Sequence, residues 1–294
     1  MKGFTIKLMR VLSLFDGISC ARVALDRAGV EVSEYLASEI DKHAIAVSTK
    51  HYPDITRLGD VRDVKDVGSI DLLIGGSPCQ DLSIAKRGRQ GLDGNRSSLF
   101  WEYVRVLREV KPTYFILENV ASMSKADKAI ITETLGVEPV MIDASLVSAQ
   151  SRKRLFWTNL PQTGLPADRG ILLNHILEPE VDESYTTTRS SFTPTGGRQI
   201  GYIGATAGQA NRVYSPDGKS ATLSANGGGS GAKTGLYQVD GRIRKLTPVE
   251  CERLQGVPDG YTEGISKTQR YKCLGNAFNV DVIAHLLTPL RNPS

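Results

Sequence analysis

Short apolar runs alternate along the first half of the chain with longer segments in which apolar residues recur every three or four positions. The short runs predict buried strands, and the longer segments predict helices. Because the two alternate, we expect an α/β fold with a mostly parallel sheet covered by helices. The predicted strands are residues 11–15, 35–38, 71–74, 114–117, 140–142 and 155–157, and the predicted helices are residues 21–28, 43–50, 99–110 and 280–287.

A glycine turn and two acidic residues follow the first three predicted strand regions. Phe15-Asp16-Gly17-Ile18-Ser19 leads into a helix, and its glycine lets the backbone approach a ligand. Glu39 stands where doubly wound folds bind ribose hydroxyls, and Asp60 is placed to face an adenine amino group. Each carboxylate alone is equally well explained as a solvated loop residue. Since no Gly-rich phosphate cradle accompanies them, the set favours a nucleoside without phosphates, which suits S-adenosylmethionine.

A cysteine follows the apolar run 70–74, in Gly75-Gly76-Ser77-Pro78-Cys79-Gln80. A lone cysteine after a strand is more often a small buried residue than a nucleophile, so only its order among other motifs favours catalysis. The four cysteines form no CxxC pair and the histidines have no ligand spacing. We therefore expect neither a metal site nor a disulfide framework, and a reducing compartment.

Length and charge limit the classes of protein that the chain can represent. Its 294 residues suit one large domain, or a large and a small one. The net charge of +4 is uneven, since residues 150–294 hold 17 Lys and Arg against 12 Asp and Glu. A basic C-terminal half indicates a polyanionic partner or a solvated basic surface. The apolar run near the start is too short for a signal peptide, and no segment reaches a transmembrane length, so we expect a soluble cytoplasmic protein.

Further motifs follow in a fixed order along the chain. They are Glu118-Asn119-Val120, Gln150-x-Arg152-x-Arg154, the block Arg244-Lys245-Leu246-Thr247-Pro248-x-Glu250-Cys251-x-Arg253-Leu254-Gln255-Gly256, and Gly275-Asn276-Ala277. Together with Phe15-Asp16-Gly17 and Pro78-Cys79-Gln80, this ordered set resembles the DNA cytosine-5 methyltransferases almost from end to end. Residues 75–84 are similar to the catalytic segment of animal de novo methyltransferases. Residues 212–215 and 221–229 are similar to the recognition region of bacterial HhaI-type methyltransferases.

The resemblance implies a Rossmann-like S-adenosylmethionine-dependent methyltransferase domain with a smaller target-recognition domain. Residues 1–164 with 271–294 are expected to form the catalytic and cofactor-binding domain, and residues 165–270 the recognition domain and hinge. The implied reaction is methylation of cytosine carbon 5 in duplex DNA, giving S-adenosylhomocysteine, without a metal. The recognition region suggests a GCGC-like site. We also expect a bacterial or phage source and a monomeric enzyme that acts in the bacterial cytoplasm or nucleoid. A partner restriction endonuclease is part of the same expectation.

Family motifs carry functional roles onto matching positions of this chain. Cys79 is the implied nucleophile at carbon 6 and Glu118 the carboxylate that hydrogen-bonds ring nitrogen 3. Arg154 is expected to hold the cytosine carbonyl, and Arg152 to support the flipped nucleotide's backbone. The implied cofactor contacts are Phe15, Gly17, Ile18, Glu39, Ile40, Asp60, Val61, Pro78, Asn276 and Ala277. The implied DNA contacts are Gln80, Ser83, Arg87, Arg89, Gln209, Arg212, Thr222 and Gly229.

Two other functions stay open from the sequence. An RNA cytosine-5 methyltransferase would use the same chemistry, although the long segment similar to a DNA reader argues against it. A catalytically silent DNA-binding regulator would lose Cys79, Glu118 or the paired arginines, and here all are present. One departure from the family is Ser19, which stands where a second glycine is common, so we expect altered cofactor contacts there.

Overall fold

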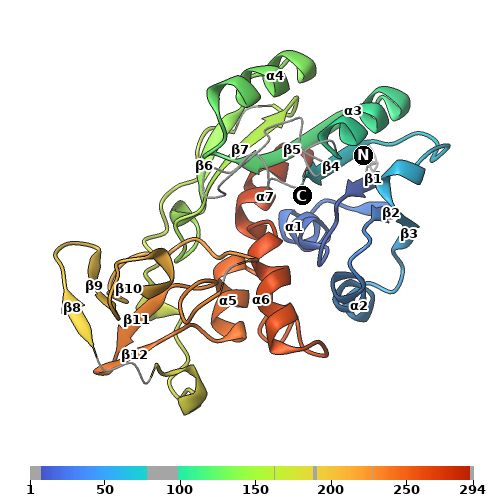
Figure 1. Cartoon of the computed structure of the whole chain (residues 1–294). Helices are drawn as coiled ribbons and strands as arrows, with labels where there is room; N and C mark the ends of the chain where they lie inside the picture. Colours follow the sequence, from blue (N-terminus) through green and yellow to red (C-terminus); the bar gives the residue numbers. More distant parts are fainter. Residues whose placement is uncertain (1–7, 78–98, 162, 188–190, 227, 292–294) are drawn as a thin grey trace, which may run out of the picture. The chain divides into compact units, whose positions relative to one another are not determined.

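The computed structural model describes residues 8–77, 99–161, 163–187, 191–226 and 228–291. The chain divides into two compact units (Figure 1). Unit 1 consists of residues 1–142, 153–165 and 282–294, and unit 2 of residues 143–152 and 166–281. Residues 143–152 and 271–281 thus group with unit 2, whereas the domain expected from the sequence placed them in the catalytic part. The assignment of separate functions to the two parts stays a prediction.

Unit 1 contains a seven-stranded sheet in the order β3-β2-β1-β4-β5-β7-β6. Strand β1 pairs in parallel with β2 and β4, β4 pairs in parallel with β5, and β7 runs antiparallel to β5. The α/β prediction is confirmed, and all six predicted strands are present, although the first ends at Leu14 rather than Phe15. The strands are β1 Met9–Leu14, β2 Val32–Ser38, β3 Thr56–Gly59, β4 Leu72–Gly76, β5 Tyr114–Val120, β6 Val140–Asp143 and β7 Lys153–Thr158.

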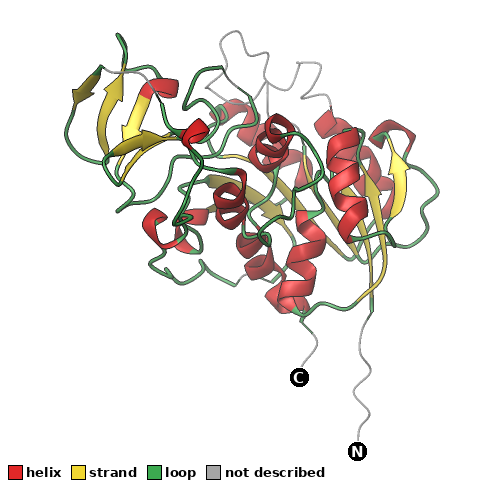
Figure 2. Ribbon diagram, turned by 90° about the horizontal axis from the view of Figure 1, so that it is seen from below, coloured by secondary structure: helices red, strands yellow, loops and turns green. Residues whose placement is uncertain are grey.

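The helices of unit 1 follow from caps and apolar faces. Asp41 begins α2 by accepting hydrogen bonds from two first-turn N–H groups, and Ser124 begins α4 by accepting one from the Asp127 N–H. Helix α3 buries Phe100, Tyr103 and two valines in the core. Figure 2 shows helices flanking the strands of the large sheet. The helices are α1 Cys20–Ala28, α2 Lys42–His51, α3 Leu99–Val110 and α4 Lys125–Leu135, and α7 Val280–Leu287 spans the boundary between the units.

Unit 2 is built on a five-stranded sheet in the order β12-β11-β10-β9-β8 and on two packed helices. The motif 244–256 runs from the last residue of β12 through α5 to its C-cap Gly256, and Thr247 and Glu250 open the helix with a capping box. Glu250 is fully buried and takes two hydrogen bonds from Arg244, which satisfies its charge inside the protein. The elements are β8 Phe192–Pro194, β9 Gln199–Ile203, β10 Arg212–Tyr214, β11 Leu236–Val239, β12 Arg242–Arg244, α5 Pro248–Gln255 and α6 Lys267–Asn276.

Within the described residues, every helix is too short or too polar to cross a membrane. The same residues contain no cluster of three or more histidine, cysteine or acidic side chains that could hold a metal ion.

Candidate functional site

The parallel strands of unit 1 bring five predicted site segments to one edge of the sheet. In register, Ser38 of β2 lies beside Gly59 of β3 and Leu14 of β1. Leu14 in turn lies beside Gly75 of β4, and Gly76 lies beside Glu118 of β5. The residues that directly follow β3, β2, β1 and β4 are therefore Asp60, Glu39, Phe15 and Ser77, in that order along the edge, and Glu118 lies within β5 beside Gly76. This is the edge at which open α/β sheets bind ligands.

The turn after β1 is tightly wound. Phe15, Gly17 and Ser19 have φ values of 58°, 58° and 59°, all in the left-handed region. Outside glycine this conformation costs about 1 to 2 kcal/mol per residue, so surrounding contacts must hold the turn in place. One such contact comes from Glu39, which accepts a hydrogen bond from the Gly17 N–H at 2.8 Å.

Glu39 links the turn after β1 to the start of the loop before α2. Its other carboxylate oxygen accepts from the N–H groups of Ile40 and Asp41, both at 2.8 Å. A carboxylate offers about four acceptor positions, so three backbone donors leave one for a ligand hydroxyl. Ile40 is 70% exposed, which places a large apolar side chain in solvent beside this carboxylate.

Open space lies over two glycines at this edge. A Cβ atom at Gly17 or at Gly59 would meet no atom within 4 Å. Asp60 follows Gly59 and caps a short 3-10 helix through the Arg62 N–H at 3.0 Å, while its other oxygen lies 3.4 Å from the Arg62 guanidinium. Free backbone surface, an exposed apolar side chain and two carboxylates fit the ribose and adenine of S-adenosylmethionine. The predicted contacts Ile18 and Val61 are buried, with 1% and 4% of their surface exposed.

Strand β5 supports the base of the predicted nucleophile loop. Asn119 is fully buried, and its amide donates to the Ser77 hydroxyl at 3.1 Å while its carbonyl accepts from the Val120 N–H at 2.8 Å. Ser77 is the last described residue before the predicted catalytic segment. The predicted site residues Pro78, Cys79, Gln80, Ser83, Arg87 and Arg89 lie outside the described residues.

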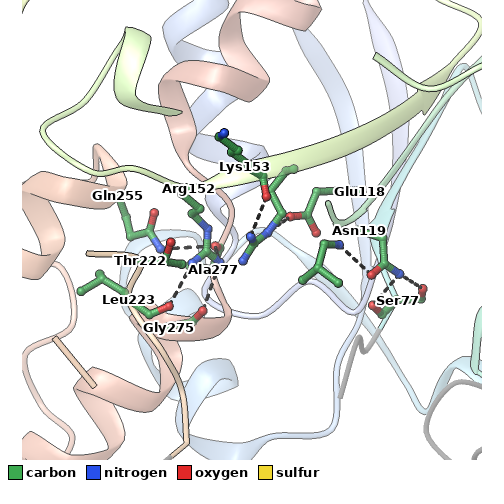
Figure 3. A network of polar contacts seen from close by, with 12 residues as sticks. Ser77, Glu118, Asn119, Arg152, Lys153, Thr222, Leu223, Gln255, Gly275 and Ala277 are labelled. Atoms are coloured by element: carbon green, nitrogen blue, oxygen red, sulfur yellow. Dashed lines mark hydrogen bonds and ion pairs between the residues drawn. The ribbon is translucent and has the colours of Figure 1, made fainter. Parts of the chain in front are cut away.

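Glu118, which is labelled in Figure 3, forms an ion pair with Arg154 at the same edge of the sheet. The Arg154 Nε lies 2.7 Å from a Glu118 carboxylate oxygen, with 15% and 13% of the two side chains exposed. The pair arises because β5 and β7 are antiparallel neighbours, with Val120 opposite Arg154. Arg154 also donates to the Lys153 carbonyl at 2.9 Å, which fixes the guanidinium beside the carboxylate.

Arg152 lies in unit 2 and is placed differently from its neighbour in the motif. Only 3% of its surface is exposed, and its guanidinium donates to the backbone carbonyls of Leu223, Gly275 and Ala277. Asn276 is exposed at the end of α6, and Ala277 is buried. These two predicted cofactor contacts belong to unit 2, whereas the carboxylates above belong to unit 1.

The four described residues with predicted DNA contacts are all exposed in unit 2. Gln209 begins a short 3-10 helix whose Ala210 lies against Gly229, since a Cβ atom there would come within 3.1 Å of the alanine methyl group. Arg212 follows this helix and donates to the Ala207 carbonyl at 3.2 Å. Thr222 lies in a separate segment, where its hydroxyl donates to the Ser151 carbonyl. Gln209, Arg212 and Gly229 therefore lie in one loop cluster, and Thr222 lies in a different segment.

Sequence reasoning missed a buried polar network beneath the turn after β1. Asp16 has a fully buried carboxylate that accepts from the hydroxyls of Tyr35 and Ser19 and lies 3.9 Å from the Arg57 guanidinium. Burial raises the pKa of Asp16 above its ordinary value, against the opposing effect of these hydrogen bonds. Ser19 also bonds the Ser48 hydroxyl, so the serine that replaces the common family glycine ties the turn to α2. The only sequence signal was that departure from the family pattern.

A parallel-rich sheet with carboxylates after neighbouring strands is typical of Rossmann-like methyltransferase domains of the kind that uses S-adenosylmethionine. The chain matches the family model for C-5 cytosine-specific DNA methylases over residues 9–193 and 174–292. It belongs to that family, which confirms the resemblance drawn from the motifs, and it is a DNA cytosine-5 methyltransferase.

Known proteins similar to this chain agree with that assignment. It is 30% identical over 308 residues to the type II methyltransferase M.HhaI of Haemophilus parahaemolyticus, an alignment that covers 95% of this chain and 93% of that protein. It is 29% identical to the type II methyltransferase M1.ScrFI of Lactococcus lactis subsp. cremoris, covering 93% and 76% of the two chains. The S. pombe Dnmt2 methyltransferase has a similar fold, with a TM-score of 0.69 at 19% identity over 96% of this chain and 98% of that one.

Proposed function

We propose that this enzyme methylates cytosine carbon 5 within a specific sequence of duplex DNA, through a covalent bond between Cys79 and cytosine carbon 6. One observation carries the proposal: Asp60, Glu39 and Phe15 follow neighbouring strands at one edge of the sheet, and Glu118 lies near the end of β5 at the same edge. The chain continues from that edge, through Ser77, into the segment that contains Cys79. The proposal therefore puts the groups that bind the nucleoside, Glu39 and Asp60, at the same edge of the sheet as Glu118, which shares a proton with the cytosine.

Each residue of the proposed cofactor site binds a different part of S-adenosylmethionine. Glu39 binds the ribose hydroxyls with its remaining acceptor position, and Asp60 faces the adenine amino group. Ile40 covers an apolar face of the base, and the left-handed turn at Gly17 leaves room for the amino-acid portion. When bound, S-adenosylmethionine supplies an electrophilic methyl group on a sulfonium, and S-adenosylhomocysteine is the product.

Cytosine carbon 5 is a poor nucleophile until a group adds at carbon 6. In the proposed reaction the Cys79 thiolate forms a bond to carbon 6, and the electrons of the ring double bond move to make carbon 5 nucleophilic. Glu118 hydrogen-bonds ring nitrogen 3 as charge develops, and Arg154 holds both Glu118 and the cytosine carbonyl. After methyl transfer, a base removes the carbon 5 proton, the double bond re-forms, and the bond to Cys79 breaks to release the thiolate.

The Cys79 thiol cannot reach a cytosine that is stacked inside the duplex, so the target cytosine must be flipped out. Gln209 is proposed to occupy the space that it leaves, and Arg212 to read a guanine through its two terminal nitrogens. Thr222 and Gly229 are proposed as further contacts, together with Gln80, Ser83, Arg87 and Arg89. A GCGC-like site, a monomeric enzyme and a partner restriction endonuclease belong to the same proposal.

Bisulfite sequencing tests the proposed function directly. Unmethylated plasmid DNA is incubated with the protein and S-adenosylmethionine, and protected cytosines in one repeated sequence context are expected. The Cys79→Ser variant serves as the matched control and is expected to leave all cytosines convertible while it still binds DNA. Complete conversion with the unaltered protein, with cofactor binding established by calorimetry, would overturn the proposal. Parallel reactions with tRNA would then separate an RNA methyltransferase from a silent DNA-binding relative.

A further inference from the structure

Three buried polar side chains of unit 2 join two segments that are distant in sequence. Gln150, Arg152 and Gln255 are 0%, 3% and 0% exposed. We call these three residues the clasp. Arg152 donates to the Leu223 carbonyl at 3.2 Å and to the carbonyls of Gly275 and Ala277 at 3.0 and 2.9 Å (Figure 3). One guanidinium therefore bridges residues that lie 71 and 123 positions from it along the chain.

The two glutamines of the clasp repeat this bridge. Gln150 accepts from the Leu223 N–H at 3.0 Å and donates to the Gln255 side chain at 3.3 Å. Gln255 in turn donates to the Leu274 carbonyl at 2.6 Å. Hydrogen bonds thus run without a break from one segment to the other through fully buried side chains. Each lost bond would leave a buried backbone group without a partner, which is costly inside a protein.

Backbone packing shows how closely the segments approach each other. A Cβ atom at Gly275 would lie 2.3 Å from the Ala225 nitrogen and 2.4 Å from the Ser224 carbonyl carbon. No side chain fits at that distance from backbone atoms. Segment 222–225 and segment 274–277 therefore touch directly, and the clasp surrounds the contact.

We propose that Arg152 is a positioning residue, and that the clasp couples DNA binding at segment 222–225 to cofactor binding at segment 274–277. The inference rests on the proposed function, which assigns a DNA contact to Thr222, and on the cofactor contacts that the family resemblance implies for Asn276 and Ala277. A guanidinium that contacts a DNA phosphate must be exposed, whereas the Arg152 guanidinium is buried and donates hydrogen bonds to three backbone carbonyl groups. By linkage, DNA strengthens cofactor binding by the same factor as the cofactor strengthens DNA binding.

The test uses Arg152→Met with two matched controls. Arg244→Met removes another buried arginine of unit 2, which donates to Glu250 and to the Lys245 carbonyl rather than to the clasp. Lys153→Met removes the exposed charge next to Arg152. Three quantities are measured on the full chain: hydrogen exchange of peptides covering 222–226 and 272–278, the Kd of S-adenosylhomocysteine with and without unmethylated plasmid DNA, and the salt dependence of DNA binding.

In Arg152→Met both peptides are expected to exchange faster in the free protein, and the strengthening of cofactor binding by DNA is expected to fall about tenfold. The slope of DNA affinity against salt concentration is expected to stay unchanged. Neither control should show the joint change in the two peptides. A slope reduced by about one, with unchanged exchange, would identify a phosphate contact instead and overturn the proposal.

A second variant covers the case in which Arg152→Met does not fold. Gly275→Ala forces the two segments apart while it leaves all three clasp side chains in place, and it is expected to give the same joint change in exchange and coupling. Unchanged coupling in that variant would contradict the inference. Hydrogen exchange in the free protein needs no ligand, so it tests the positioning role of Arg152 separately from the proposed function. If both peptides exchange faster in the variant but the unaltered protein binds no S-adenosylhomocysteine, the proposed function is refuted and the positioning role of Arg152 is retained.

Discussion

Replacement of Glu118 by glutamine is expected to remove most of the activity while it preserves the shape of the site. The Glu118 carboxylate lies 2.7 Å from the Arg154 Nε, and both side chains are more than four-fifths buried. With charge centres about 4 Å apart and an effective dielectric constant of about 20, the gross attraction is about 4 kcal/mol. Desolvation of both groups offsets part of it, and a net coupling of about 2 kcal/mol remains.

Two losses combine in this variant. A group that shares a proton with the reacting base contributes about 10²-fold to 10⁴-fold in rate, and Glu118→Gln removes that proton exchange. It also releases Arg154 from its ionic partner. If the pair acts as one unit, the double variant Glu118→Gln/Arg154→Met loses less than the sum of the single losses. The shortfall corresponds to the coupling of about 2 kcal/mol, or about 30-fold in rate.

Single-turnover transfer of a tritiated methyl group to unmethylated plasmid DNA measures these rates. The affinity for S-adenosylhomocysteine is measured in parallel and is expected to stay unchanged, because Glu39 and Asp60 are intact. Arg169→Met, which removes a largely exposed arginine paired with Asp281, provides a control that should keep its rate within about twofold. Rate losses that multiply independently in the double variant would refute the pairing of Glu118 and Arg154 as a functional unit.

Three further outcomes follow from buried groups of unit 1 and from the cysteines. Asn119→Ala leaves the Val120 N–H and the Ser77 hydroxyl without their partner, and is expected to lower the free energy of unfolding by about 2 to 4 kcal/mol in urea titrations; a change below about 0.5 kcal/mol would contradict this role. Burial raises the pKa of Asp16 above 3.8, so the folded state holds this proton more tightly than the unfolded state. Stability relative to Asp16→Asn should therefore fall as pH rises from 3.8 through the folded pKa, and a rise over that window in urea unfolding would argue against the assignment. Iodoacetamide applied to the native protein is expected to leave the buried cysteines Cys20, Cys251 and Cys273 unlabelled, as measured by peptide mass spectrometry. Labelling of any of the three before unfolding would contradict their burial.

The large sheet was predictable because its central strands β1, β4 and β5 are apolar runs buried on both faces. Strand β3 escaped prediction because its four residues are exposed or half-buried and give no apolar run. The small sheet of unit 2 also gave no signal, because its strands are three to five residues long and its described core cluster has only three buried residues. Short strands with so little burial carry no periodicity that a sequence can display.

Site residues were predictable in proportion to how local their signal is. The positions of Glu39 and Asp60 were predictable because each follows a strand, and the strand order puts these two strand ends side by side; their roles stay predictions. The environment of Arg152 could not be found, since its partners are backbone carbonyls more than 70 positions away that have no signature in the side-chain sequence. A charged residue in a motif suggests an exposed ligand contact, and only the fold reveals that this one is enclosed. Asp16 is a similar case, because its burial depends on Tyr35 and Arg57 from two other strands.

The composition of unit 1 from three separate stretches of chain constrains how this protein is made. Its final stretch, residues 282–294, contributes Val282, Ile283 and Leu287 with at most 2% of their surface exposed, and His285 lies 3.1 Å from the Thr163 hydroxyl. A ribosome adds these residues only after it has synthesised all of unit 2. The large sheet of unit 1 therefore cannot complete its packing before unit 2 has been made, and until then the growing chain exposes apolar surface that molecular chaperones are suited to cover.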